Sequence, residues 1–516
     1  MEPAYIGSYT TAKSAQEIAV TSFAMRWFFD SIPRAICYMI SYLSTIGLLL
    51  ALFLSYPDKP EGPIWLLSFI AFAPLLFSIM LNKHSYSQIY VAPFVMLIST
   101  WCVISVDLSF SLLYALILGA SFWLLMSVSI HIWMEARSGS IDQGFVVRFA
   151  CLYLLISYIV ANVCGILASV AVQLYRSPFI LQPISIFGFG SLEALVILVN
   201  GFIAWTFHDL FVNKSLSRSL LRIPVLYLVV ILGVWFSIAG VITATQKEIS
   251  TVKVSTLDYD IYHFSAWGIP ESYRNMGRAI QEKIESSGAQ VVVLPESSIV
   301  GSEEETCLDI VTKYIAPFIQ GSGAHVTLGC SSYDENSVCS WRNLAISIDP
   351  NGLVAHVYGD MRSLPGQESC TQPGFASLPH PRGFGFSSLV GFDLDLIGPV
   401  SSCADLGSSL IVKPSSHSLS LRRKLASWVI RAVENRVAVV SAATRNNAAI
   451  IDPFGNIRAY SGRNALASLS AEISLSEPLK LNWVRQHFVY WLFIAGYAVL
   501  TSLDVHRLLM RRRRFV

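Results

Sequence analysis

The chain has 516 residues, of which 53% are hydrophobic and only 14% charged, and its mean hydropathy is +0.55. Soluble globular proteins carry about a quarter of their residues as charged side chains, so this composition excludes an ordinary soluble protein and indicates a multi-pass membrane protein. The net charge of +2 excludes a basic nucleic-acid-binding surface. The nine cysteines show neither CxxC nor Cys/His metal spacing, and nothing in the sequence predicts a metal or a cofactor.

Apolar stretches of about 20 residues are long enough to cross a hydrocarbon core of roughly 30 Å. Eight stretches are predicted to do so: 35–56, 64–81, 88–106, 108–134, 149–175, 191–212, 223–245 and 486–505. The predicted domains are a cytosolic segment (1–34), a seven-helix membrane domain (35–245), a water-soluble domain (250–482), an eighth helix (486–505) and a basic cytosolic tail (506–516). No predicted span carries the buried charge pair that would favour a transporter.

The distribution of basic residues predicts the orientation. With the N-terminus in the cytosol, the inner loops hold Lys13, Arg26, Arg34, Lys83, Arg137, Arg148, Lys214, Arg218, Arg222 and Arg511 to Arg514, whereas the outer loops hold Lys59 and Arg176. The positive-inside rule therefore places the soluble domain on the non-cytosolic side of a bacterial inner (plasma) membrane or an endomembrane.

The segment 251–482 alternates short strands with polar helices. A strand at 251–257, a polar helix at 270–287 and an apolar run at 291–294 form a strand–helix–strand unit typical of parallel pairing. Two hairpins are predicted around the turns Asp349-Pro350-Asn351-Gly352 and Asp452-Pro453-Phe454-Gly455. The pattern predicts an α/β sandwich of about 230 residues.

Glu296 follows the buried run 291–294 directly, after Pro295. Ligand sites of open α/β sheets lie at the carboxyl ends of strands, so Glu296 is a candidate functional carboxylate. The alternative at this point is an exposed loop acid.

The run VVVLPESS resembles the nitrilase (carbon–nitrogen hydrolase) superfamily, whose active site uses Glu, Lys and Cys. The matching segments, in order, are VVVLPE (291–296), RNLAISIDPNGLVAHVYGD (342–360), LPGQES (364–369), LVGFDLDL (389–396), RAVEN (431–435) and AAIIDPFGNI (448–457). IAFAPLL (70–76) and LQPISIFGFGSLEALVILVN (181–200), with its Gln…Gly…Asn pattern, resemble one branch of that superfamily, apolipoprotein N-acyltransferase.

The resemblance implies eight spans and a nitrilase-type α-β-β-α sandwich domain between the seventh and the eighth. It also implies transfer of an acyl chain from a phospholipid donor, through a cysteine thioester, to the amine of a lipoprotein or another acceptor.

The catalytic residues are only partly present. Glu296 matches the general base and Glu368 a supporting acid, but the lysine position holds Asp360 and the cysteine position holds Gly391. The mechanism needs a thiolate and a cation for the oxyanion, and neither is present at these positions. Two interpretations follow: an impaired N-acyltransferase-like or amide-cleaving enzyme, and a non-catalytic pseudoenzyme that binds a lipid, lipoprotein or other partner.

Substitutes for the missing groups are few. Arg362 lies near Asp360, although an ion pair is the simpler role for it, and Cys403, Ser387 and Ser388 are the nucleophilic types nearest to Gly391. The cysteine fits a buried position and the serines a polar loop. His417 fits a solvated loop as well as a ligand contact.

Cys330 and Cys339 bracket a short polar loop in the non-cytosolic domain. A disulfide between them is feasible in an oxidising compartment, and two free thiols are the alternative.

Overall fold

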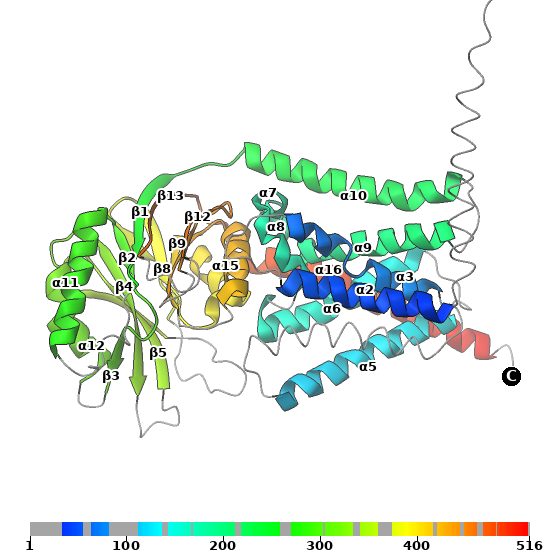
Figure 1. Cartoon of the computed structure of the whole chain (residues 1–516), viewed down its shortest axis with the longest axis horizontal. Coiled ribbons are helices and arrows are strands. Elements are labelled where there is room, and N and C mark those ends of the chain that lie inside the picture. Colours follow the sequence, from blue (N-terminus) through cyan, green and yellow to red (C-terminus); the bar gives the residue numbers. More distant parts are fainter. Residues whose placement is uncertain are drawn as a thin grey trace, which may run out of the picture.

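The chain forms a bundle of long helices and an α/β part at one end of the bundle (Figure 1). The computed structural model describes residues 34–54, 63–81, 112–136, 143–166, 169–211, 218–258, 270–302, 305–333, 341–359, 374–415, 421–443, 448–461, 468–480 and 482–513. The long helices are α2 (Arg34–Leu54), α5 (Leu112–Ala136), α6 (Gln143–Cys164), α9 (Phe189–Phe211), α10 (Arg218–Ala244) and α16 (Asn482–Arg513). Shorter helical pieces are η1 (Pro63–Phe69), α3 (Ala73–Leu81), η3 (Val170–Arg176), α7 (Pro178–Leu181) and α8 (Ile184–Phe187).

Seven of the eight predicted apolar stretches are helical in the structure, and the remaining one, 88–106, lies outside the described residues. Five described segments are long and apolar enough to cross a membrane: Ile64–Leu81, Gly144–Asn162, Phe189–Leu210, Ile223–Ala244 and Val484–Arg511. The number of spans stays a prediction.

The predicted span 149–175 has the wrong bounds, because this stretch is not one continuous helix. The helix α6 runs from Gln143 to Cys164 and ends at Gly165, which has a φ of +71° that favours glycine. The rest of the predicted stretch forms the separate η3 turn.

Several basic side chains lie at the end of the helix bundle that is far from the α/β part. α16 begins beside the α/β part and ends at that far end with Arg511, Arg512 and Arg513 (Figure 1). Arg148 near the start of α6 pairs with Asp504 near the end of α16, and Arg511 donates to the Glu135 carbonyl at the end of α5. These basic side chains therefore lie at the end of the bundle opposite to the α/β part.

A buried charge pair lies in the bundle. The Arg148 Nε–Asp504 Oδ2 distance is 2.6 Å, and both side chains are buried. The prediction that no span carries such a pair was wrong, because Arg148 was placed just outside a helix that in fact begins at Gln143.

Asn200 compensates for an interruption between η1 and α3. Its side-chain oxygen accepts hydrogen bonds from the Phe72 and Ala73 amides at 2.8 and 3.0 Å, and its Nδ2 donates to the Ser68 carbonyl at 2.8 Å. These backbone groups are buried, so a side chain must satisfy them in place of water. The Asn of the Gln…Gly…Asn pattern thus has a structural role.

The α/β part contains two sheets. The first has the order β13-β1-β2-β4-β5-β6, with β3 paired to β4, and the second has the order β12-β11-β10-β9-β8-β7. The strands of the first are β1 (Ser250–Thr256), β2 (Val291–Val293), β3 (Ile299–Gly301), β4 (His325–Tyr333), β5 (Trp341–Ile348), β6 (Val354–Gly359) and β13 (Ser470–Leu475). Those of the second are β7 (Leu378–His380), β8 (Phe384–Ser388), β9 (Ser408–Ser415), β10 (Ala438–Ala443), β11 (Ala449–Ile451) and β12 (Ile457–Tyr460).

The sheets lie face to face between two helical layers. Valines of β1 and β2 share a core with Leu410 and Val412 of β9, so these faces pack together. The outer face of the first sheet is covered by α11 (Pro270–Ser287), α12 (Cys307–Ile310), η5 (Val311–Ile315) and α13 (Ala316–Ile319). The outer face of the second is covered by α14 (Gly398–Asp405) and α15 (Leu421–Asn435). The described part is thus the expected α-β-β-α sandwich, visible edge-on in Figure 1.

Both predicted hairpins are confirmed. β5 pairs with β6, and β11 with β12, in antiparallel register. Each turn is closed by its aspartate: Asp349 Oδ1 accepts from the Asn351 amide and Asp452 Oδ1 from the Phe454 amide, both at 2.9 Å.

Cys330 is bonded to Cys307, not to Cys339. The predicted pairing with Cys339 was therefore wrong for Cys330, and Cys339 itself lies outside the described residues. Cys307 begins α12 on the outer face of the first sheet, and Cys330 lies on the adjacent strand β4, so the side-chain contact is long-range and invisible to loop spacing.

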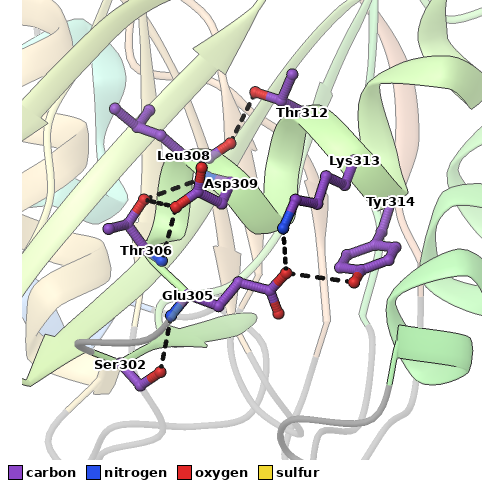
Figure 2. A network of polar contacts seen from close by, with 8 residues as sticks. All are labelled: Ser302, Glu305, Thr306, Leu308, Asp309, Thr312, Lys313 and Tyr314. Carbon is purple, nitrogen blue, oxygen red and sulfur yellow. Dashed lines mark hydrogen bonds and ion pairs between the residues drawn. The ribbon is translucent and has the colours of Figure 1, made fainter.

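A network of polar contacts fixes the start of α12 (Figure 2). Thr306 and Asp309 form a capping box, in which Thr306 Oγ1 accepts from the Asp309 amide at 3.3 Å. Hydrogen bonds from Thr306 lower the pKa of Asp309. Glu305 Oε1 accepts from Lys313 Nζ at 3.0 Å and from the Tyr314 hydroxyl at 3.2 Å. These exposed groups satisfy one another, so they serve the helix start rather than a ligand.

The helix α15 fastens the α/β part to the bundle. Glu434 accepts a hydrogen bond from the Phe189 amide at 2.8 Å, and Gln486 Nε2 donates to Asn435 Oδ1 at 3.1 Å. Arg436, just after α15, donates to Gln182 Oε1 at 2.8 Å and to Ser185 Oγ at 3.0 Å. The two parts also share one apolar core. The RAVEN segment and the Gln of the Gln…Gly…Asn pattern therefore join the two parts.

Candidate functional site

The chain makes a sharp turn at Gly391, the position of the missing cysteine. β8 ends at Ser388, Gly391 has a φ of +64°, and the short helix η6 (Asp393–Asp395) leads into α14. A strand–turn–helix of this kind exposes a nucleophile in several hydrolase families. The elbow, as we call residues 389–392, keeps a left-handed backbone conformation that glycine adopts without strain.

Glu296 lies after the end of β2 and against β9. Its amide donates to the Ser415 carbonyl at 3.1 Å. A side chain at Gly329 would approach the Glu296 Cα to 2.5 Å, so the close approach of β4 to this residue requires glycine. The next residue, Ser297, has a φ of +56°, which is strained for a residue other than glycine, and strain of this kind concentrates at functional sites.

Lys413 joins the elbow to Glu296 through the same strand. Its Nζ donates to the Gly391 carbonyl at 2.5 Å and lies 5.5 Å from the centre of the Trp428 ring. Ser415, which binds the Glu296 amide, is two residues further along β9, a step of about 6.6 Å. Glu296 and Gly391 are therefore both held by the last three residues of β9.

Three carboxyl groups and one lysine act on Lys413, and burial raises the pKa of one of these carboxyl groups, that of Asp395. Burial lowers the pKa of the Lys413 amine to about 8, and Lys424 acts in the same direction, whereas Asp395, Glu296 and Asp393 oppose this. Asp393 Oδ2 accepts a hydrogen bond from the buried Tyr358 hydroxyl at 2.8 Å. A buried amine whose pKa is shifted, close to carboxyl groups, is a common feature of functional sites.

Lys413 belongs to this site although it was not among the predicted site residues. The signal was present: a lysine ends the apolar strand run of β9, immediately before Pro414. A charged side chain at the carboxyl end of a buried strand is the feature that singled out Glu296, and it applies equally here.

Four of the predicted site residues, Asp360, Arg362, Glu368 and His417, lie outside the described residues. Their roles stay predictions.

The three nucleophilic side chains nearest to Gly391 in sequence have structural environments. Cys403 is buried in α14, and burial raises the pKa of its thiol to about 12. Ser387 Oγ donates to the Ala376 carbonyl at 2.6 Å, and Ser388 Oγ is 2.6 Å from Ser347 Oγ. A neutral thiol and two bonded hydroxyls are poor nucleophiles.

The loop that follows the elbow rests on the helix bundle. A Cβ at Gly165 would lie 2.8 Å from the Asp395 carbonyl oxygen and 3.3 Å from the Phe392 ring. The end of α6 thus supports η6 directly, and the site adjoins the end of the bundle.

No protein-family model matches the chain, and no curated protein matches it. Solved structures similar to it include an amidase from Nesterenkonia sp., with 14% identity, a TM-score of 0.38, and coverage of 48% of this chain and 98% of that one. Saccharomyces cerevisiae Nit3, a member of branch 10 of the nitrilase superfamily, has 14% identity, a TM-score of 0.36 and coverage of 44% and 91%. The C. elegans NitFhit protein has 18% identity, a TM-score of 0.34 and coverage of 44% and 62%.

Proposed function

We propose that this chain is an integral membrane protein of the nitrilase superfamily, similar to apolipoprotein N-acyltransferase, whose α/β domain binds an acyl ligand without forming a cysteine thioester. The ligand would be a phospholipid acyl donor or a lipoprotein. The elbow carries the proposal, because the backbone of a nucleophile turn is present at Gly391 while the nucleophilic atom is absent.

The surroundings of the elbow support a binding role. Lys413 donates to the elbow, Glu296 is held by the end of the same strand, and η6 rests on the helix bundle, where lipid chains would approach. Cys403, the only free thiol of the described α/β residues, is buried in α14 with a raised pKa.

The proposal predicts that the purified protein transfers no acyl chain by the thioester route. The assay follows a labelled acyl chain from phospholipid to a lipopeptide in detergent, with mass spectrometry of all cysteines. An N-acyltransferase with an intact Glu-Lys-Cys site is the positive control. We expect Gly391→Cys alone to remain inactive, since groups that act as a unit are not restored singly and position 360 would still hold aspartate. A thioester on Cys403, with turnover abolished by Glu296→Gln, would contradict the proposal.

A second candidate function, acyl transfer or amide cleavage by a relocated mechanism, is favoured by one observation. Glu296 is bonded to the end of β9 through its amide, and Lys413 is part of that strand. Together they offer a carboxylate and a cation. Turnover in the same assay without any thioester, lost in both Glu296→Gln and Lys413→Met, would select this function.

We also propose that the α/β domain lies on the non-cytosolic side. The Cys307–Cys330 disulfide suits an oxidising compartment, and the basic residues at the opposite end of the bundle suit the cytosol.

This topology predicts opposite labelling of two engineered cysteines. Leu353→Cys, at a residue 65% exposed in the α/β part, should react with an impermeant thiol reagent in intact cells. Arg511→Cys, at the far end of α16, should react only after the membrane is opened. The reverse pattern would overturn the topology.

A further inference from the structure

Two buried histidines connect the two sheets of the α/β part. His325 is the first residue of β4 and His380 is the last residue of β7, so one imidazole comes from each sheet. Their ring centres are 5.0 Å apart, and the two residues are 5% and 6% exposed. His325 also meets the Phe386 ring edge-on at 5.1 Å, and His380 stacks on the Phe384 ring at 4.3 Å. The β7–β8 hairpin therefore packs on the first sheet through a cluster of rings that includes both imidazoles.

The hydrogen bonds of the pair require neutral imidazoles. His380 Nδ1 accepts a hydrogen bond from the Arg382 amide at 3.2 Å. A ring nitrogen can accept only while it carries no proton, so the imidazolium, whose two nitrogens are both donors, loses this bond. His325 Nδ1 is buried without a hydrogen-bond partner in the described part of the chain. Charging either ring would therefore place a cation in a site built for a neutral group.

The groups that face the pair act in both directions. Asp349, in the turn between β5 and β6, favours protonated His325. The Gln290 carbonyl favours protonated His380, whereas His325 and Arg382 disfavour it. Burial is the largest effect on both imidazoles: it lowers the pKa of His325, and it is the main cause that lowers the pKa of His380 from 6.5 to about 4.

The hairpin that His380 holds leads directly to the elbow. β7 is the edge strand of the second sheet, and β8 ends at Ser388, the residue before the elbow. Ahead of β7, the Phe375 ring lies 5.8 Å from the Tyr358 ring, and the Tyr358 hydroxyl donates to Asp393 just after the elbow. Separation of the hairpin from the first sheet would therefore reach the elbow from both sides.

We propose that His325 and His380 form an acid-sensitive latch: uptake of a proton by either imidazole releases the β7–β8 hairpin, and with it the elbow, from the first sheet. A released imidazole regains its ordinary pKa and holds the proton more tightly, so the latched state is lost as the pH falls from about 6.5 toward 4. The proposal concerns the position of the hairpin and not the ligand, so it goes beyond the proposed function and does not depend on it.

Hydrogen exchange of the full-length protein in detergent tests the latch. Exchange is measured by mass spectrometry at about pH 7.5 and about pH 5, and is corrected for the intrinsic effect of pH on amide exchange. We expect peptides that cover 375–392 to lose protection by about tenfold at the lower pH, since a shift of one pKa unit corresponds to a factor of ten. Peptides of β10, inside the same sheet, should change by less than about twofold.

A double variant removes the titrating groups and keeps the packing. His380→Asn retains an acceptor oxygen near the position of Nδ1, and His325→Phe retains an aromatic ring. The protection of 375–392 in this variant should change by less than about twofold between the two pH values. His506→Gln, which removes an exposed imidazole at the far end of α16, is the matched control and should respond as the wild type does.

Unchanged protection of the wild-type hairpin at the lower pH, or an equal loss in the folded double variant, would overturn the proposal. A loss as large in β10 as in the hairpin would also contradict it, because it would indicate acid unfolding of the whole domain. If the double variant does not fold, the single variants decide: a smaller pH response than that of the wild type supports the latch, and an equal response contradicts it. The proposed function stands in each of these cases.

Discussion

Replacing Asp504 by alanine is expected to lower the free energy of unfolding by about 3–5 kcal/mol. Arg148 Nε donates to Asp504 Oδ2 at 2.6 Å and Nη2 donates to Oδ1 at 3.3 Å, and the side chains are 4% and 0% exposed. Without the carboxylate, the guanidinium stays buried with no counter-charge. Denaturant titration of the full chain in detergent, followed by tryptophan fluorescence, measures the loss.

Arg507 provides a matched control, because it binds the same carboxylate from a half-exposed position. Its Nη1 lies 2.9 Å from Asp504 Oδ1, and Arg507→Ala is expected to cost less than about 1 kcal/mol. The double variant Arg148→Met, Asp504→Leu should be nearly neutral, since it removes both charges together. A loss as large in Arg507→Ala as in Asp504→Ala would show that burial of the pair is not the cause.

The sequence predicted the local features of the fold well. The two hairpins follow from turn residues that act within four or five positions, and the apolar stretches follow from composition alone. Helix ends were less accurate. Gly165 ends α6 through its backbone conformation, and Arg148, which lies inside α6, is paired there with a distant residue, Asp504.

Features that depend on distant contacts could not be predicted from the sequence. Arg148 and Asp504 are 356 residues apart in the sequence. Cys307 and Cys330 form a disulfide because the helix α12 packs on the strand β4. The candidate site shows the same division. Glu296 and Gly391 were placed from local motifs, whereas Lys413 gains its importance from a bond to the Gly391 carbonyl 22 residues away.

The buried amine of Lys413 should give the stability of the protein a measurable pH dependence. Burial lowers its pKa from 10.5 to about 8 in the folded chain. Between these pH values the unfolded chain holds the proton that the folded chain has released. The free energy of unfolding therefore rises as the pH rises from about 8 to 10.5. The gain from this one group is at most about 3 kcal/mol, at 1.36 kcal/mol for each pH unit.

The difference between the wild type and Lys413→Met isolates this contribution from other groups that titrate in the same range. We expect the wild type to gain stability relative to the variant as the pH rises from about 8 to 10.5. Below pH 8 the difference in stability between the two proteins stays constant. In that range Lys413→Met is the more stable protein if the cost of desolvating the amine exceeds the contribution of its hydrogen bond to the Gly391 carbonyl. A difference curve that stays flat from pH 8 to 10.5 would mean that the Lys413 amine is hydrated.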